Sequence, residues 1–235
     1  MSQGDRREKI VVLSGSGLSA ESGLPTFRDA AGLWRQHSWV DLASPEGWRR
    51  NPALVLEFYN ERRAKAWAAE PNAAHRAIAS LESRYEVVVV TQNVDALHER
   101  AGSTRVLHVH GELAWARGTG PARHRYRIDG APISLGETCD EGTQLRPDIV
   151  WFGEETQHMD EARAHVASAD KVLVVGTSLT VYPAAGLVDA ARPDSERVLN
   201  SLEMDAIPPG FRFERGKAGE VIPRIVDAWL RRGIS

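Results

Sequence analysis

The residues KIVVLSGSGLSAESGLP, positions 9–25, join an apolar run to a turn of glycine and serine. After Lys9 the run to Leu13 is entirely isoleucine, valine and leucine, which is typical of a strand buried on both faces of a parallel sheet. Gly15, Gly17 and Ala20 then match the pattern G-x-G-x-x-(G/A), whose glycines let the backbone approach a pyrophosphate at a helix N-terminus. The stretch predicts a strand, a phosphate-binding turn and a helix, and an ordinary Gly- and Ser-rich turn is the alternative.

The sequence after this turn is a poor match to an ordinary dehydrogenase. The dehydrogenase fingerprint continues with an acidic residue about 20 positions further on, at the end of a second strand. Asp41 has this spacing, but it lies in SWVDLASPEGW, which lacks a strand pattern. We therefore expect a nucleotide-binding turn in a protein that is not an ordinary dehydrogenase.

Similar apolar runs recur along the chain and alternate with helix-like stretches, which predicts an α/β fold. The other runs are Val87 to Thr91, Ile149 to Phe152, Val172 to Gly176 and Arg197 to Asn200. The predicted helices are Ser19 to Gly23, Pro52 to Ala69, Ala73 to Glu82, Asp95 to Ala101, Met159 to Ala167, Pro183 to Ala191 and Val221 to Arg232. We expect a Rossmann-like parallel sheet domain of about residues 1–28, 83–113 and 145–235. Two insertions, a helical one over about 29–82 and one over about 114–144, would form a smaller lobe.

The composition excludes several classes of protein. With 29 Lys and Arg against 32 Asp and Glu, the net charge is 29 − 32 = −3, so nucleic-acid binding through a concentrated basic surface is not expected. No apolar run approaches the roughly 20 residues of a membrane span, and residues 1–9 show no signal-peptide pattern. The single cysteine, Cys139, excludes an intramolecular disulfide. We expect a cytoplasmic protein that binds neither membranes nor nucleic acids.

Five motifs together resemble the sirtuins, the NAD-dependent protein deacylases. They are GSGLSAESGLPTFR at 15–28, TQNVDALH at 91–98, HGE at 110–112, RPDIVWFGE at 146–154 and GTSLTVYPAA at 176–185. They occur in the family's order and extend over nearly the whole chain. The resemblance implies NAD as cofactor and acylated lysine in proteins or peptides as substrate. It implies nicotinamide, free lysine and an O-acyl-ADP-ribose as products.

The resemblance also assigns site residues. Asn93, Asp95 and His110 would be catalytic, with His110 as general base on a ribose hydroxyl. Gln92, Asn93 and Asp95 follow a predicted strand, where open α/β sheets bind ligands, although Asn93 or Asp95 as a helix N-cap is an alternative. His98, in a predicted helix, and His108, which would face the opposite side of an extended segment, do not match the catalytic position. The residues expected to bind NAD are Gly15, Ser16, Gly17, Ser19, Ala20, Thr26, Phe27, Arg28, Gln92, Asn93, Asp95, Gly176, Thr177, Ser178, Asn200 and Ala218. The match is weakest at Asn200-Ser201-Leu202, where the family's Asn-Leu-Glu carries an extra residue.

Two regions bear on substrate choice. Val150, Trp151, Phe152, Gly153 and Glu154 correspond to the family segment that pairs with an extended peptide. Tyr59 and Arg62 lie three residues apart, on one face of a predicted helix, where a phenol and a guanidinium suit a carboxylate at the end of an acyl chain. The desuccinylase-type sirtuins carry this pair, so succinyl or malonyl lysine is expected beside acetyl lysine. Ordinary helix-face residues are the alternative.

One departure from the family concerns metal. The related sirtuins carry two cysteine pairs that hold zinc in the region matching 114–144, but here Cys139 stands alone. His124, Glu137, Asp140 and Glu141 lie nearby without the spacing of a structural zinc site, so no metal is expected. The rival functions are an NAD glycohydrolase or ADP-ribosyltransferase that uses the same pocket, and a non-catalytic NAD-sensing module.

Overall fold

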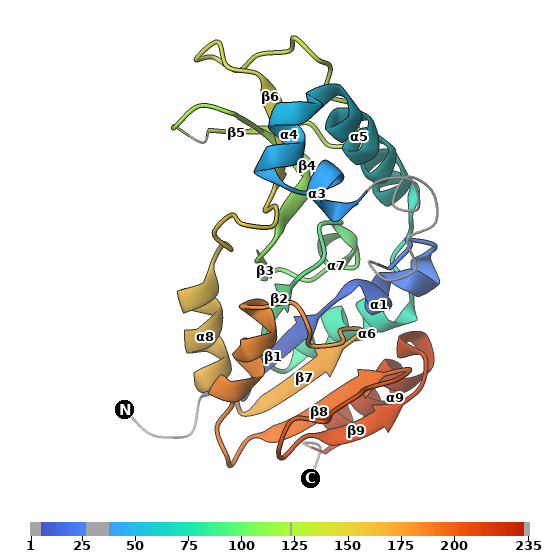
Figure 1. Cartoon of the computed structure of the whole chain (residues 1–235). Helices are drawn as coiled ribbons and strands as arrows, with labels where there is room; N and C mark the ends of the chain where they lie inside the picture. The colour runs from blue at the N-terminus through green and yellow to red at the C-terminus, as the bar shows by residue number, and fades with distance from the viewer. Residues whose placement is uncertain (1–5, 27–37, 123, 233–235) are drawn as a thin grey trace.

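The computed structural model describes residues 6–26, 38–122 and 124–232. Six of its strands form one parallel sheet, here called the large sheet, in the order β3-β2-β1-β7-β8-β9 (Figure 1). These strands are β1 Lys9–Ser14, β2 Glu86–Thr91, β3 Val106–His108, β7 Lys171–Val175, β8 Glu196–Ser201 and β9 Arg212–Arg215. The order reverses between β1 and β7, as in a Rossmann fold, so the predicted fold class is confirmed.

The large sheet is covered by helices on both faces, which explains its continuous apolar strands. Ile10 and Val12 of β1 pack with side chains of α6 (Ala73–Ser80) and α9 (Ala218–Arg231). Val11 and Leu13 pack instead with α8 (Met159–Ala167) and the 3-10 helix η3 (Ala184–Ala190). Successive strand residues point to opposite faces, so both faces select apolar side chains.

A second, three-stranded antiparallel sheet lies beside the large sheet (Figure 1). This small sheet has the order β5-β4-β6, with β4 Gly111–Gly118, β5 Arg125–Arg127 and β6 Leu145–Ile149. The prediction of a strand over 149–152 was wrong, because the strand ends at Ile149 and pairs with β4. The apolar residues beyond it bond elsewhere: Val150 N donates to His110 O, and Phe152 N donates to Ala43 O.

The remaining helices connect or cover the sheets. They are α1 Ser16–Ser19, η1 Ala20–Ser22, α3 Trp39–Leu42, α4 Pro45–Arg50, α5 Pro52–Ala68, η2 Leu81–Ser83 and α7 Leu97–Arg100. The first helix thus begins at Ser16, three residues before its predicted start, and α7 begins two residues after its predicted start. Ala74 and Ile78 of α6 share the core of α9, although they fall in the first predicted insertion; the division of the chain into two domains stays a prediction. In the described part of the chain no helix is long and apolar enough to cross a membrane.

Candidate active site

The turns after β1 and β7 meet where the strand order of the large sheet reverses. Gly15 N donates to Val175 O at 3.0 Å, and Gly17 N donates to Gly176 O at 2.8 Å. A Cβ on Gly17 would lie 2.9 Å from the carbonyl oxygen of Gly176, and one on Gly176, whose φ is +64°, would lie 2.2 Å from Leu18 N. These glycines are therefore required by the contact between two backbone segments, a reason beyond the approach to a phosphate that their pattern indicated.

Two predicted catalytic residues lie against this turn. Asn93 Nδ2 donates to Gly15 O at 3.2 Å and to Ser19 Oγ at 3.1 Å, and Ser19 Oγ donates to Asp95 Oδ2 at 3.0 Å. All three side chains are buried. Asp95 Oδ1 also accepts from the N–H of Leu97, the first residue of α7, at 3.1 Å, but the N-cap of this helix is Ala96, so neither Asn93 nor Asp95 is the predicted alternative cap. One carboxylate thus serves both the helix start and the polar cluster.

Burial governs the pKa of Asp95. It raises this pKa, and the hydrogen bonds from Leu97 and Ser19, together with the charge of His108, oppose the rise without cancelling it. A buried carboxylate held by three favourable interactions is a common feature of functional sites, because such groups seldom persist without a role.

His110 follows β3 and contacts the loop after β2 that carries Asn93 and Asp95. Its Nδ1 is 3.2 Å from Gln92 O, and a carbonyl can only accept, so Nδ1 carries the proton and Nε2 of the neutral ring is free to accept one. Burial lowers the pKa of His110, and the bond to Gln92 opposes this only in part. A neutral imidazole with an available Nε2 is suited to act as a general base.

The other two histidines singled out from the sequence have internal partners. His98 Nε2 lies 2.9 Å from Ser14 Oγ, and His108 Nε2 lies 2.7 Å from Glu99 Oε1. The expectation that His108 and His110 would face opposite sides of an extended segment was wrong, because residues two apart in such a segment share a side, and β3 in any case ends at His108. His108 Nδ1 lies 2.9 Å from Asn93 O, so the two rings bond to carbonyls of neighbouring residues.

Several further residues predicted to bind NAD lie around β7, β8 and α9. Gln92 Nε2 donates to Thr177 Oγ1 at 3.2 Å, and Ser178 Oγ lies 2.8 Å from Thr180 Oγ1. Asn200 Nδ2 donates to the carbonyls of Glu214 (2.8 Å) and Gly216 (3.0 Å). Its side chain therefore fixes the loop before Ala218, the first residue of α9. Ser16, Ala20 and Thr26 are at least partly exposed near this edge, whereas Phe27 and Arg28 lie outside the described residues.

Tyr59 and Arg62 come together on α5. Tyr59 is buried against Phe58 and Trp151, with ring centroids 5.0 and 6.4 Å away. Burial raises the pKa of Tyr59 to about 12, against the charge of Arg62. The guanidinium carbon of Arg62 lies 5.5 Å from the Phe58 ring centroid, and its buried Nε has no hydrogen-bond partner among the described residues. Burial lowers the pKa of Arg62, and Tyr59 and Asp95 oppose this shift.

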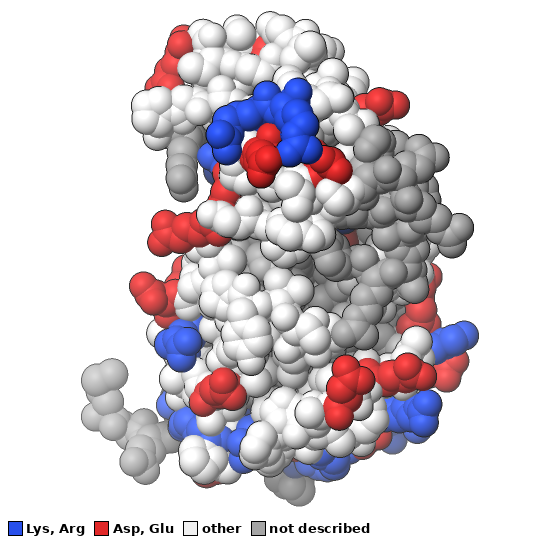
Figure 2. All heavy atoms as spheres, viewed as in Figure 1, with Lys and Arg blue, Asp and Glu red and all other residues white. Residues whose placement is uncertain are grey.

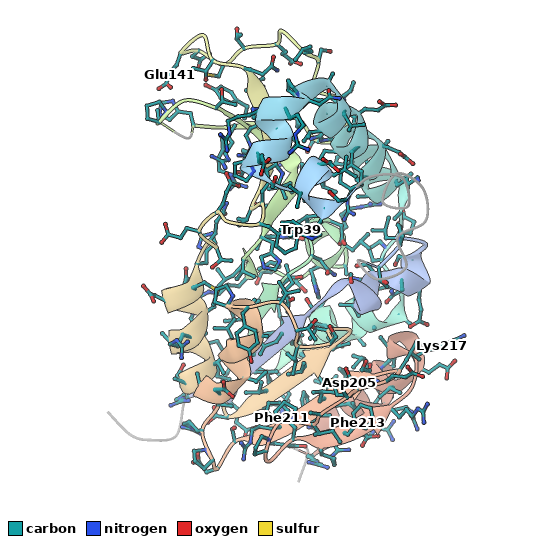
Figure 3. All side chains as sticks on the ribbon, in the orientation of Figure 1. Trp39, Glu141, Asp205, Phe211, Phe213 and Lys217 are labelled. Atoms are coloured by element: carbon teal, nitrogen blue, oxygen red, sulfur yellow. The ribbon has the colours of Figure 1, made fainter. Side chains whose placement is uncertain are left out.

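The predicted peptide-binding segment divides into internal and exposed residues. Trp151 is 2% exposed, and Arg146 stacks on its ring at 3.2 Å. Glu154 accepts from Trp151 N at 2.9 Å and pairs with Arg146 at 2.7 Å. Trp151 and Glu154 therefore stabilise the turn through internal contacts. Phe152, by contrast, is 40% exposed and packs edge-on against Trp39 at 4.9 Å. Trp39 is the first residue of α3, and it lies on the side of this helix toward the large sheet (Figure 3). Val150 is partly exposed and Gly153 is exposed.

On the face of the molecule in Figure 2, the described residues carry their charges mainly above and below a middle whose described atoms are mostly uncharged. Lys and Arg atoms gather over α4 with Asp and Glu directly beneath them, as expected from the ion pairs of Arg50 with Asp41 and Glu46. The charge of Arg50 in this patch is therefore balanced by its acidic neighbours.

In the small lobe, Cys139 is part of an apolar cluster with Leu56, Ile133 and Leu145. Its Sγ lies 3.1 Å from Thr143 Oγ1, and His124 is exposed. Among the described residues, the His, Cys, Asp and Glu side chains grouped closely enough to hold a metal ion are Glu99, His108 and Glu112. This group lies at the end of β3 and not beside Cys139.

Sequence reasoning missed two polar residues that end strands. Ser14 Oγ donates to Thr91 Oγ1 at 2.9 Å, and Thr91 Oγ1 accepts from Asn93 N at 3.0 Å. Both are fully buried, so this chain of bonds fixes the loop that carries the predicted catalytic residues. The signal was a hydroxyl at the last position of each of two otherwise apolar strands.

Comparison with known proteins places this arrangement in a family. Residues 15–183 match the model of the Sir2 family. An NAD-dependent protein deacylase of Helicobacter pylori is 50% identical over 188 residues, which cover 80% of each chain. A mutant Sir2 homologue in complex with ADP-ribose has 38% identity and a TM-score of 0.88, over 96% of this chain and 93% of the other. A Sir2 protein bound to an acetylated peptide has 27% identity and a TM-score of 0.78, over 97% and 95%. The chain therefore belongs to the Sir2 family.

Proposed function

We propose that the protein is an NAD-dependent deacylase of lysine side chains in proteins or peptides. The observation that carries the proposal is the neutral His110, whose ring bonds to Gln92 O in the loop of the buried Asn93 and Asp95, at the edge where the strand order reverses. The relative named as an NAD-dependent protein deacylase and the structure with an acetylated peptide support it. Such an edge is where open α/β sheets bind nucleotides.

The residues at this edge fit NAD. The buried amide of Asn93 and the carboxylate of Asp95 offer polar groups that suit ribose hydroxyls and a carboxamide, whereas the backbone amides of Gly15 and Gly17 already donate within the protein. NAD, when bound, supplies the ADP-ribosyl group that accepts the acyl group from lysine. In this proposal Asn93 and Asp95 orient the nicotinamide side of the cofactor, and His110 Nε2 takes a proton from a hydroxyl group.

We further propose that the enzyme accepts succinyl or malonyl lysine as well as acetyl lysine. The partly buried Arg62 supports this step: its Nε is buried without a hydrogen-bond partner among the described residues, and a buried donor without a partner is costly. A carboxylate at the end of an acyl chain would pair with the guanidinium and accept from the phenol of Tyr59. An acetyl group offers no such partner.

Mass spectrometry of acetyl, succinyl and malonyl peptides incubated with NAD tests the proposal. A deacylase releases nicotinamide only when an acyl peptide is present, and each nicotinamide accompanies one deacylated peptide. Nicotinamide release without peptide would indicate an NAD glycohydrolase, and a mass increase of a protein by ADP-ribose would indicate an ADP-ribosyltransferase. NAD binding without turnover would leave a sensing module.

A further inference from the structure

His108 is buried at the end of β3, next to the loop that carries Asn93. Its Nδ1 lies 2.9 Å from Asn93 O, and its Nε2 lies 2.7 Å from Glu99 Oε1 on α7. Because a carbonyl and a carboxylate both accept, each ring nitrogen must carry a proton to make its bond. The two contacts together therefore require the charged, doubly protonated ring.

The surroundings of His108 favour that charge. Burial lowers the pKa of His108, but the hydrogen bond and charge of Glu99, the charge of Glu112 and the bond to Asn93 outweigh it, so the pKa is raised above 6.5. The nearby His98 does not compete, since burial lowers its pKa well below 6.5. Among the described residues, Asp95 feels the charge of His108, Arg125 pairs with Glu112, and Arg62 interacts in turn with Asp95.

The charged ring acts on both residues assigned to the nicotinamide side. Asn93 is held at its N–H by Thr91, at its side chain by Gly15 and Ser19, and at its carbonyl by His108. The charge of His108 lowers the pKa of Asp95 against the effect of burial. Removing this charge while Glu99 stays ionised would therefore favour the protonated form of Asp95.

A metal ion is a weaker explanation of this cluster. Glu99, His108 and Glu112 each offer a ligand atom, all within 4.8 Å of one another. However, Arg125 lies 2.5 Å from Glu112 Oε1, and His108 Nε2 already bonds to Glu99. A second cation in this place would repel the guanidinium, whereas a protonated histidine balances the two carboxylates.

We propose that the Glu99–His108 pair is a positioning device for nicotinamide release, which fixes the Asn93 carbonyl and places a buried positive charge beside the loop of Asn93 and Asp95 without touching substrate. This inference rests on the proposed deacylase function. Nicotinamide release would precede the proton transfer assigned to His110, so exchange of labelled nicotinamide into NAD, in the presence of an acyl peptide, reports on Asn93 and Asp95 alone.

The test compares pH profiles of nicotinamide exchange. His108→Asn retains a donor at the position of Nδ1 but removes the charge, so the acid limb of the profile should move up by about one pH unit as Asp95 becomes harder to ionise. The double variant His108→Asn with Glu99→Gln removes the opposing charge as well, so the limb should return toward the wild-type position. A variant that merely damages packing would not be rescued in this way.

Loss of the hydrogen bond is tested separately. His108→Leu should lower the kcat of exchange by about 10-fold or more, with the Kd for NAD changed by less than about threefold. His165→Asn and Glu161→Gln are the matched controls, because His165 bonds to Lys9 near the start of β1, away from the site. Both controls should retain the wild-type profile.

The outcomes separate the two proposals. A wild-type enzyme that exchanges no nicotinamide with any acyl peptide would overturn the proposed function. If the wild-type enzyme is active and His108→Asn has the same pH profile of nicotinamide exchange, the positioning role is overturned. It is also overturned if the acid limb of the profile stays shifted in the double variant. If His108→Leu does not fold, the rescue by Glu99→Gln still decides the question.

Discussion

The two ends of the proposed site are organised in opposite ways. At the edge of the large sheet, Asn93, Asp95 and Ser19 bond to one another, and their loop is tied to β1 and β3. On α5, by contrast, the partly buried Arg62 has a buried Nε without a hydrogen-bond partner in the described part of the chain. We infer that Asn93 and Asp95 are oriented before substrate binds. Arg62 Nε, by contrast, would gain a hydrogen-bond partner only from the substrate.

The largest expected effect is at the chemical end. His110→Ala should lower the rate of deacylation by about 10² to 10⁴, because it removes the general base, while the Kd for NAD stays within a few fold. Peptide turnover and calorimetric NAD binding measure the two quantities. His124→Ala, at an exposed histidine of the small lobe, is the control and should leave both unchanged. Near wild-type turnover of His110→Ala would remove it from the mechanism.

The next effect separates the specificity end from the chemical end. A charge-assisted contact contributes about 1.5 to 3 kcal/mol, so Arg62→Met should lower kcat/KM for succinyl peptide about 10- to 100-fold. For acetyl peptide, which lacks a carboxylate, the change should be only a few fold.

The control for this comparison lies on the same helix. Lys65→Met removes a cation whose partner is the exposed Glu61, so neither substrate should be affected by more than a few fold. Equal losses for the two peptides in Arg62→Met would leave Tyr59 and Arg62 as ordinary helix-face residues. The specificity would then be plain deacetylation.

A smaller effect concerns two histidines of the chemical end. The pKa of His110 is lowered by burial, and that of His108 is raised above 6.5 because Glu99 outweighs the effect of burial. As pH rises, His110 should therefore lose its proton below pH 6.5 and His108 above it. An NMR titration of ¹⁵N-labelled histidine rings measures both midpoints. The reverse order would contradict the assignment of one as base and the other as a fixed charge.

No change is expected from removal of metal. Cys139 packs among apolar side chains and bonds to Thr143, so the fold of the small lobe should not depend on zinc. Purified protein should contain much less than one zinc per chain, and a chelator should leave its Tm unchanged. One zinc per chain with a Tm lowered by chelator would show that the lobe uses ligands other than a cysteine set.

The sequence predicted the parts of the fold that are dictated locally. β1, β2, β7 and β8 are apolar on both faces because helices cover both sides of the large sheet, so each appears as a continuous run. β9, with the sequence RFER, is a polar edge strand, and β3 has only three residues; neither gives such a signal. The strands of the small sheet alternate polar and apolar residues too weakly to be recognised.

For the site, too, the sequence predicted the residues with a local signal and missed those that depend on distant contacts. Asn93 and Asp95 in one motif, and His110 in another, could be named because each motif follows an apolar run and matches a known family. The roles of Ser14, Thr91 and Glu99 depend on contacts between strands and helices that are distant in sequence. The glycines of the first turn were recognised for a phosphate, but their tight contact with Gly176 becomes visible only when β1 and β7 are adjacent.

The most direct test of the proposed function is the ratio of nicotinamide released to peptide deacylated, measured by mass spectrometry with and without acyl peptide. The proposal requires one nicotinamide and one O-acyl-ADP-ribose for each deacylated lysine, and no nicotinamide above background without peptide. Nicotinamide release that continues at the same rate without peptide would contradict it, because the site would then cleave NAD with water and not transfer an acyl group.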